Sequence, residues 1–506
     1  MNNHELFHRI NVMFQTSQFD DSYHLGMELL EKFPEEYELY RITGISAIQM
    51  CNYEKGYALL EHYHQKYPND ADICFRLAKL SEGFGHIEAA IVFYQKSLTI
   101  RSTFVVFFHL AKLYSERGDV VHALKYYKEA YQMNPKNVSL LINISNTLLF
   151  LGKTKQAQKT IQKALQIEPK NPIIHYNLSN IKKYRSLDTH MKDMLCILEQ
   201  ENCSTEQKAL LHFALGKAYS DLSMFQKSIH HIKLANTLWN SKFQFDIEEQ
   251  KCHFQKCQNM YSDHLLPSPQ TLSKKPIFIV GMPRCGSTLI EQILSCHSKV
   301  HAMGETDLFS RTVHTALQKT DNSTCKDAFW DFVRKEYIQK VQLLRIDEEY
   351  MTDKMLFNFV WIGVIFSLFP DAKIVHVQRE PMATCWSIYK HLFTNTSIQF
   401  AYSQENIASY YNLYVDVMNY WEKKYPNRIL HVNYEQLTEK QELVTKQILQ
   451  YLELEWEEDC LNFHEQKSYI QTTSSQQVRK KIYRDSSSKW KLFQDHLQPM
   501  VNKLKA

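Results

Sequence analysis

Residues 277–294, IFIVGMPRCGSTLIEQIL, contain a glycine loop of the kind that binds phosphate groups. A short apolar run leads into Gly281, and after four residues the chain reads Gly286, Ser287 and Thr288. A nucleotide triphosphatase would carry a lysine directly after the second glycine. Here that position is serine, and the nearest cation is Arg284, inside the loop. The residues therefore predict a loop that holds an anion without the usual lysine.

The residues on either side of this loop supply the strand and the helix that a phosphate site needs. The run 277–280 is typical of a buried parallel strand. Apolar residues then recur at helical spacing: Leu289, Ile290, Ile293 and Leu294. Backbone N–H groups of the loop and of the helix N-terminus would face an anion. A tight turn without a ligand is the alternative, and it accounts less well for two glycines that flank an arginine.

A second strand and helix, within residues 372–393, place another arginine near a hydroxyl group. Residues 373–378 are predicted to form a strand, with Arg379 at its C-terminal end. Pro381 opens a helix, and Ser387 follows Arg379 by eight residues. An arginine at a strand end and a hydroxyl on the next helix can bind one phosphate between them. Two such sites at the carboxyl ends of parallel strands suit a nucleotide that is charged at both ends.

The magnesium ligand of nucleotide triphosphatases is also missing from the strand ends. The strand KIVHV is followed by Gln378 and Arg379, and no other apolar strand ends in a suitably placed aspartate. Without the lysine and this carboxylate, triphosphate hydrolysis by a P-loop kinase or NTPase is a poor fit.

These patterns lie in the second half of the chain, for which we predict an α/β P-loop-like domain with a central parallel sheet, residues 276–506. A proline- and serine-rich break at 264–276 precedes it. The most apolar stretch, LFNFVWIGVIFSLF (356–369), is too short to span a bilayer and is expected to form a buried helix.

The first half, residues 1–265, carries an internal repeat. Gly85, Gly118 and Gly152 are spaced by 33 and 34 residues. The same steps separate small or aromatic positions of successive units: Ala90, Ala123 and Ala157; Tyr94, Tyr127 and Ile161; Ser97, Ala130 and Ala164. This period and these positions are typical of tetratricopeptide repeats, which form an α-helical solenoid. A degenerate unit follows at 211–238, with Ser223 in place of the turn glycine.

Two roles are open for the repeats. They could bind a protein or peptide partner in a concave groove, which we favour, or they could only stack and support the second domain.

The composition is that of an ordinary globular protein. Hydrophobic residues make up 44% and charged residues 23% of the chain. A net charge of +4 over 506 residues is too small to indicate a nucleic-acid partner. The 11 cysteines are scattered and odd in number, which suits a reducing cytosol. Because the N-terminal MNNHELFHRI lacks the apolar core of a signal peptide, we expect a cytoplasmic protein without a membrane span.

Six segments of the second half resemble a known family. They are PIFIVGMPRCGSTLIEQIL, HAMGETDLF, TDKMLFNF, KIVHVQREPMATCWSIYKHLF, VNYEQL and YRDSSSKW. Their order and spacing are similar to those of sulfotransferases that use 3′-phosphoadenosine-5′-phosphosulfate (PAPS). The likeness is greatest to bacterial tetratricopeptide-repeat sulfotransferases, whose catalytic domain resembles tyrosylprotein sulfotransferases. It covers about residues 205–500.

This resemblance implies a nucleotide site. Arg284, Gly286, Ser287 and Thr288 would hold the 5′-phosphosulfate of PAPS, with Cys285 in the same loop at a position where the family usually has serine. Arg379 and Ser387 would hold the 3′-phosphate. Tyr434, and Lys489 or Trp490, would lie near the nucleotide. The basic segment 479–491 would close over the 3′-phosphate, or it is a solvated loop. Sulfuryl transfer requires no metal.

The resemblance also implies two catalytic residues. Glu305 matches the base that accepts the proton of the acceptor hydroxyl. Its alternative role is a cap of the following helix, since Glu-Thr-Asp is also a capping sequence. Lys354 matches the lysine that stabilises the bridging oxygen. Its alternative role is a salt bridge with Asp353.

The implied reaction is sulfation of a hydroxyl group, most simply that of a protein tyrosine. A carbohydrate, a lipid or a small phenol would suit the same catalytic groups. A P-loop kinase or NTPase is one alternative. A repeat scaffold with an inactive nucleotide-binding domain is another, and the presence of all the expected chemical groups argues against it.

Overall fold

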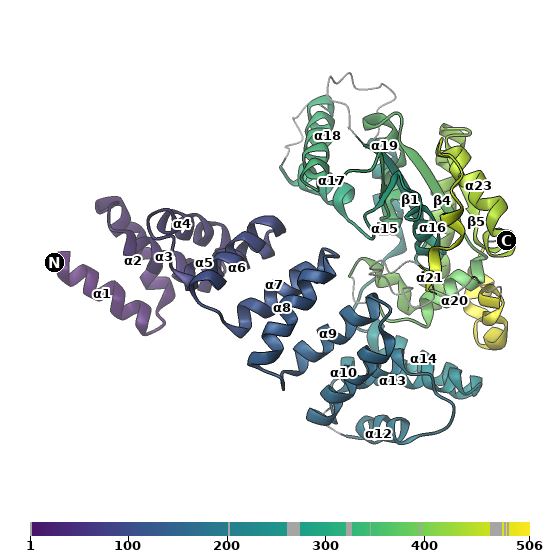
Figure 1. Cartoon of the computed structure of the whole chain (residues 1–506), viewed down its shortest axis with the longest axis horizontal. Helices are drawn as coiled ribbons and strands as arrows, with labels where there is room; N and C mark the ends of the chain where they lie inside the picture. Colours follow the sequence, from purple (N-terminus) through teal and green to yellow (C-terminus); the bar gives the residue numbers. More distant parts are fainter. Residues whose placement is uncertain are drawn as a thin grey trace. The chain divides into compact units, whose positions relative to one another are not determined.

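The computed structural model describes residues 3–200, 203–260, 274–319, 326–344, 346–393, 396–465, 478–479, 482 and 485–505. The chain forms two compact units, Met1–Thr147 and Leu148–Ala506. Figure 1 shows helices throughout the first unit and a sheet covered by helices in the second.

The first unit is built from helices that pack in sequential pairs, α1 with α2 and so on along the chain. The bounds of its complete helices are α1 Asn3–Gln15, α2 Phe19–Lys32, α3 Tyr37–Gln49, α4 Tyr53–Lys66, α5 Ala71–Gly83, α6 Ile87–Ile100, α7 Phe104–Glu116 and α8 Val120–Met133.

The turn inside each pair has a left-handed residue at a fixed place. Gly85 and Gly118 have φ values of 75° and 86°. Cys51 and Ser17, one and two repeats before Gly85, have φ values of 62° and 60°. The repeat therefore extends to the N-terminal helices, where serine and cysteine adopt the backbone conformation that glycine favours. The glycine spacing did not mark these two turns in the sequence, although Pro34 and Pro68, 34 residues apart, indicated an earlier unit.

The repeat positions predicted from the sequence are buried between the helices of each pair. Ala90 and Ala123 have no exposed surface, and Tyr94 is equally inaccessible. The Tyr94 hydroxyl donates a hydrogen bond of 2.8 Å to Glu82, so a large side chain is buried without losing its polar partner. The tetratricopeptide-like fold of the first half is thus confirmed.

The second unit begins within the array. Helix α9, Val138–Phe150, crosses the boundary between the units, and the turn after it has Gly152 at φ 74°. Ser223, predicted in place of a turn glycine, has φ 58°. The other helices of this part are α10 Thr154–Ile167, α11 Pro172–Ile181, α12 Thr189–Leu198, α13 Thr205–Asp221, α14 Phe225–Asn240 and α15 Ile247–Met260.

The last of these helices share a hydrophobic core with the α/β domain. Ile232 of α14 and Phe254 of α15 belong to the same buried cluster as Phe278 of the sheet. The side-chain amide of Asn236 donates a hydrogen bond of 2.9 Å to the backbone carbonyl of Tyr389. Most of the predicted break at 264–276 lies outside the described residues.

A parallel sheet of five strands, counted within the described ranges, forms the centre of the α/β domain. The strand order is β2-β3-β1-β4-β5, and each neighbouring pair is parallel. The strands are β1 Lys275–Gly281, β2 Val300–Ala302, β3 Tyr350–Asp353, β4 Lys373–Gln378 and β5 Ile429–Asn433. The predicted fold class is confirmed, and the carboxyl ends of all these strands meet at one edge.

The helices that directly follow β1, β4 and β5 begin at this edge. The helices of the domain are α16 Ser287–Leu294, α17 Leu308–Lys319, α18 Lys326–Leu343, α19 Ile362–Leu368, α20 Pro381–Tyr389, α21 Gln404–Lys424, α22 Tyr434–Glu439 and α23 Gln441–Tyr451, with α25 Gln498–Lys503 near the C-terminus. Short 3₁₀ helices precede α19 (η1, Leu356–Trp361) and lie within and just after the C-terminal basic segment (η5, Asp485–Ser487, and η6, Lys489–His496).

Alternate residues of β1 and β4 enter two different cores. Phe278 and Ile374 face the cluster that contains α21, whereas Ile279 and Val375 face the cluster that contains α16. Both faces of the sheet are therefore covered, as the continuous apolar strands predicted. The apolar stretch 356–369 forms η1 and α19, which are largely buried. Among the described residues, no helix is long and apolar enough to cross a membrane.

Candidate active site

The loop between β1 and α16 has a backbone that only certain residues allow. Arg284 has φ 70° and Gly286 has φ 109°. A Cβ atom on Gly286 would lie 2.3 Å from a ring carbon of Tyr434, so the ring packs directly on the glycine. Ser287 and Thr288 then begin α16 and are buried. The loop, the helix N-terminus and Tyr434 therefore form one packed unit, with Tyr434 at the end of β5.

Arg284 joins the two anion sites predicted from the sequence. Its side chain is largely buried, and its Nε donates a hydrogen bond of 3.2 Å to Oγ of Ser387 on α20. Its backbone carbonyl accepts a hydrogen bond of 3.0 Å from Nη1 of Arg379. Arg284 was predicted to belong to one anion site, and Arg379 and Ser387 to another. The three residues are neighbours in one cluster at the carboxyl ends of β1 and β4.

Arg379 is held by the C-terminal segment. Its Nη2 donates to the carbonyl of Ser486 at 2.8 Å, and its Nε donates to Oγ of Ser487 at 3.2 Å. The guanidinium lies over the ring of Tyr434, 4.8 Å from its centroid, and that ring's hydroxyl is 3.1 Å from Oγ of Ser486. The guanidinium has further N–H donors for a ligand. The basic segment 479–491 was predicted either to close over the 3′-phosphate or to be a solvated loop, and two of its serines make the contacts with Arg379.

Several positive charges lie near Lys390, at the end of α20. The pKa of Lys390 is lowered to about 7, first by burial and then by the nearby charges of Arg284, Arg379 and Lys489. The pKa of His391 is also lowered well below its usual value, first by burial and then by Arg284 and Lys390. A cluster of cations that repel one another is typical of an anion-binding site, because the charge of a bound anion would relieve the repulsion. Lys489 thus lies near the predicted nucleotide site, and Lys390 is an addition that the sequence analysis missed.

Glu305 and Lys354 lie on the other side of the loop, after β2 and β3. Oε1 of Glu305 is 3.8 Å from Nζ of Lys354. The Lys354 side chain is 1% exposed and that of Glu305 is 47% exposed, so the carboxylate opens to a surface while the ammonium is enclosed. Desolvation raises the pKa of Glu305, the charge of Glu291 adds to this rise, and the charges of Lys354 and Arg284 oppose it. A carboxylate with a raised pKa beside a buried cation suits proton transfer.

Glu291, on α16, is a buried partner of Lys354 that the sequence analysis missed. Its Oε2 is 2.6 Å from Nζ of Lys354, and its side chain is 3% exposed. The available signal was a lone carboxylate on a helix whose other residues are mostly apolar. Such a residue is rarely buried unless it is paired.

The alternative roles considered for Glu305 and Lys354 do not match the contacts observed. The carboxylate of Asp353 accepts hydrogen bonds from Tyr337 at 3.1 Å and from Asn358 at 3.0 Å, while Lys354 pairs with Glu291. Burial raises the pKa of Asp353 to about 7. The cap of the turn after β2 is made by Thr306, whose hydroxyl accepts a hydrogen bond of 3.2 Å from the N–H of Leu308.

Cys285 points away from the loop surface. Its side chain is 1% exposed and lies in the core beneath the loop with Ile277 and Ile279. Burial raises the pKa of its thiol to about 11. A buried thiol of this kind is inert, so only the backbone of Cys285 can face an anion.

The basic segment 479–491 is only partly described. Lys480, Lys481 and Arg484 lie outside the described residues. Arg479 donates a hydrogen bond to the carbonyl of Phe150, at the end of α9, and its side chain packs on Gly152. This arginine therefore contacts the repeat helices of the second unit.

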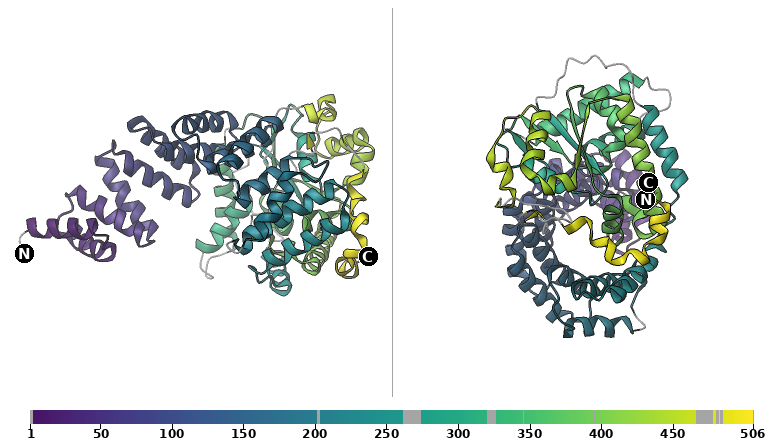
Figure 2. Two further views of the ribbon diagram at one scale, coloured as in Figure 1. Left: turned by 90° about the horizontal axis from the view of Figure 1, so that it is seen from below. Right: turned by 90° about the vertical axis from the view of Figure 1, so that its right-hand side faces the viewer.

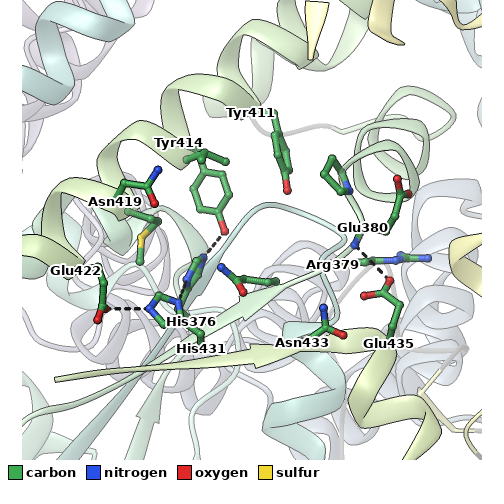
Figure 3. Close-up of a pocket in the computed structure, with 14 residues that line it drawn as sticks. His376, Arg379, Glu380, Tyr411, Tyr414, Asn419, Glu422, His431, Asn433 and Glu435 are labelled. Carbon is green, nitrogen blue, oxygen red and sulfur yellow. Dashed lines mark hydrogen bonds and ion pairs between the residues drawn. The ribbon is translucent and has the colours of Figure 1, made fainter. Parts of the chain in front are cut away.

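A cavity of about 810 Å³ opens beside Arg379 (Figure 3). Polar side chains of β4 and β5 line one wall, and α21 forms the other. A row of hydrogen bonds crosses it: Tyr414 to His376, His376 to His431 at 2.8 Å, and His431 to Glu422 at 2.9 Å. Burial, with the charge of His431, lowers the pKa of His376 to about 3. His376 is thus a neutral polar part of the sheet, and the cavity leaves room for a ligand next to the cation cluster.

No group of histidine, cysteine, aspartate and glutamate residues within the described ranges could hold a metal ion.

Comparison with known proteins identifies two kinds of domain. Residues 276–458 match the sulfotransferase family, and residues 71–104 and 114–181 match tetratricopeptide repeats. The resemblance inferred from the sequence motifs is thereby confirmed.

The similar proteins are distant in sequence. An uncharacterised protein of Aquifex aeolicus is 26% identical over 408 residues, which is 77% of this chain and 53% of that protein. A putative protein-tyrosine sulfotransferase of Caenorhabditis briggsae is 26% identical over 37% of this chain and 69% of that protein. The protein-tyrosine sulfotransferase 1 of Danio rerio is 23% identical over 42% of this chain and 65% of that protein. This chain therefore matches about half the length of the Aquifex protein.

Proposed function

Because the chain carries a sulfotransferase-family domain behind tetratricopeptide repeats, we propose that it moves a sulfuryl group from PAPS to an acceptor hydroxyl. The acceptor we propose is a protein tyrosine, since several similar proteins are protein-tyrosine sulfotransferases. The observation that carries the proposal is the Glu305–Lys354 pair, 3.8 Å apart and adjoining an arginine-bearing phosphate loop. A base, a cation and an anion cradle are the groups that sulfuryl transfer requires.

The nucleotide would occupy the cation cluster. We assign Arg284, Gly286, Ser287 and Thr288, with the backbone of Cys285, to the 5′-phosphosulfate. Arg379 and Ser387 would bind the 3′-phosphate, and Lys489 adds positive charge. Tyr434 would lie along the nucleotide. The lowered pKa of Lys390 supports this assignment, because uncompensated positive charge is what a doubly anionic ligand would meet.

In the proposed reaction the acceptor oxygen forms a bond to sulfur as the bond from sulfur to the phosphate oxygen breaks. Glu305 takes the proton of the acceptor hydroxyl. The leaving oxygen keeps the electron pair, and the ammonium of Lys354 stabilises the charge that develops there. No metal takes part. The products are a sulfate ester and 3′,5′-bisphosphoadenosine.

We further propose that the repeats bind a protein or peptide, which could be the acceptor itself. Tetratricopeptide repeats generally mediate protein interactions, and the array presents an extended surface for one. The proposed domain limits are 1–265 for the repeats and 276–506 for the catalytic domain, and the proposed location is the cytoplasm.

Calorimetry of the purified protein with 3′,5′-bisphosphoadenosine and with ATP tests this function. We expect the bisphosphate to bind more tightly, because ATP lacks a 3′-phosphate for Arg379. Glu305→Ala is expected to retain the bisphosphate affinity and to lose turnover of PAPS with a tyrosine-containing peptide. Tighter binding of ATP would contradict the choice of donor, and full turnover by Glu305→Ala would exclude Glu305 as the base.

A further inference from the structure

Glu291 links three segments that end at the candidate active site. Besides its contact with Lys354, its Oε1 accepts hydrogen bonds from the N–H of Gly304 at 3.0 Å and from the hydroxyl of Thr352 at 2.9 Å. Gly304 directly precedes Glu305, and Thr352 lies two residues before Lys354. The carboxylate of Glu291, on α16, therefore contacts the backbone next to Glu305 and the ammonium of Lys354.

The contacts divide cleanly between the two oxygens. Oε1 takes the two neutral donors, and Oε2 faces the ammonium. The second donor is itself fixed, because Oγ1 of Thr352 accepts a hydrogen bond of 3.1 Å from the N–H of Met303. Glu291 thus has little freedom to turn, and its orientation fixes where the ammonium lies.

Lys354 is shared by two carboxylates at unequal distances. Glu291 is at 2.6 Å and Glu305 is at 3.8 Å. Without the closer partner, the ammonium would be expected to move onto Glu305, since an unpaired charge is costly in a buried site. The base would then be neutralised by a direct ion pair, and the cation would leave the place where the leaving oxygen is expected.

We propose that Glu291 is a positioning residue, which keeps Lys354 off Glu305 and maintains a second negative charge beside the base. This inference rests on the proposed function. Glu291 does not touch the reacting groups. It acts through Lys354 and through its charge, and the sequence analysis assigned it no role.

The test uses Glu291→Gln. Glutamine keeps a carbonyl oxygen for Gly304 and Thr352, and its neutral amide N–H2 group replaces the charged acceptor that faces Lys354. We expect kcat for PAPS and a tyrosine-containing peptide to fall roughly 10- to 100-fold, as for other groups that orient catalytic residues. Binding of 3′,5′-bisphosphoadenosine should be retained.

The pH profile separates positioning from a purely structural role. Activity rises as Glu305 loses its proton, and the charge of Glu291 raises the pKa of Glu305. Removing that charge, and letting Lys354 approach, both lower this pKa. The acid limb of kcat in Glu291→Gln should therefore move to lower pH. An acid limb that stays in place in a folded variant would overturn the inference.

Asp353→Asn is the matched control. Asp353 is a buried carboxylate one residue from Lys354, and its oxygens are occupied by Tyr337 and Asn358. Its substitution alters a buried carboxyl group, whose pKa is raised to about 7 by burial, without changing the partner of Lys354. We expect the acid limb of this variant to remain where it is in the unmodified protein. An equal movement in both variants would show a general effect of altering a buried carboxyl group and would overturn the assignment to Glu291.

A titration without turnover separates this inference from the proposed function. The carboxyl carbon of Glu305, assigned by comparison with Glu305→Gln, can be followed by NMR in the ligand-free protein. If the unmodified protein transfers no sulfuryl group but Glu291→Gln lowers this pKa, the function fails and the role of Glu291 stands. If transfer occurs and the pKa is unchanged, the role of Glu291 fails alone.

A second pair of variants covers the case in which Glu291→Gln does not fold. Lys354→Met is compared with Lys354→Met/Glu291→Gln, in which no buried ammonium lacks its partner. The double variant should again show the lower pKa of Glu305, because the charge of Glu291 acts on it directly. If the pKa of Glu305 is equal in the single and the double variant, the charge of Glu291 does not act on Glu305, and this part of the inference is overturned.

Discussion

Lys390 provides a test of the cation cluster at the scale of one residue. With its pKa lowered to about 7, it is largely neutral above that pH when no ligand is bound. A bound dianion would raise the pKa again, so Lys390 would take up a proton on binding. The affinity for 3′,5′-bisphosphoadenosine should therefore fall as the pH rises above about 7. A phosphomonoester titrates near pH 6, so the window from pH 7 to 9 isolates the lysine.

Proton uptake can be measured directly by calorimetry in two buffers of different ionisation enthalpy. At pH 8 we expect uptake by the unmodified protein and much less by Lys390→Met. Equal uptake by both would show that another group titrates. The residues that produce this effect lie on different elements: Arg284 in the first loop, Arg379 after β4, and Lys489 near the C-terminus.

At the scale of elements, the loop between β1 and α16 depends on Gly286. Gly286→Ala would place a left-handed strain of about 1–3 kcal/mol on the backbone and would force Tyr434 from its place, since the new Cβ would lie 2.3 Å from its ring. We expect a lower free energy of unfolding and loss of bisphosphate affinity together. Chemical denaturation and calorimetry measure the two effects.

Gly83→Ala is the control for this substitution. Gly83 ends α5, and a Cβ atom there would meet nothing within 4 Å. Alanine in a helix should stabilise the protein by about 0.5–1 kcal/mol. Destabilisation of equal size by both substitutions would contradict the special role of Gly286.

The elements that the sequence predicted are those with a local signature. The strand before Gly281 and the strand before Arg379 are short apolar runs, and both occur where expected. The turns at Gly85 and Gly118 are marked by glycine. By contrast, the turn at Cys51 could not be located from the sequence, because cysteine does not indicate a left-handed backbone as glycine does.

The contacts of the site were harder to foresee because they join distant parts of the chain. The contact of Arg379 with Ser486 and that of Lys354 with Glu291 depend on which segments meet at the sheet edge. Residue type alone favoured the adjacent Asp353 as the partner of Lys354. That carboxylate instead binds Tyr337, which the fold brings from α18.

At the scale of the whole molecule, the repeats and the sulfotransferase-family domain are not separated at the end of the array. Helices α14 and α15 contribute Ile232 and Phe254 to the core that contains Phe278. The C-terminal segment also lies against α14 (Figure 2), where the rings of Phe225 and Phe493 have centroids 5.3 Å apart. The sulfotransferase-family domain therefore uses repeat helices as part of its own core.

Truncation tests this shared core. A chain that begins at Pro135, before α9, keeps every helix of the second unit and is expected to fold cooperatively and to bind 3′,5′-bisphosphoadenosine with unchanged affinity. A chain that begins at Pro276 loses α13 to α15 and exposes apolar residues such as Phe278. Exposed apolar area costs roughly 25 cal/mol per Å², so this shorter chain should aggregate or unfold at a much lower temperature. Thermal unfolding followed by circular dichroism compares the two, and equal stability would show that the catalytic domain is complete without the last repeat helices.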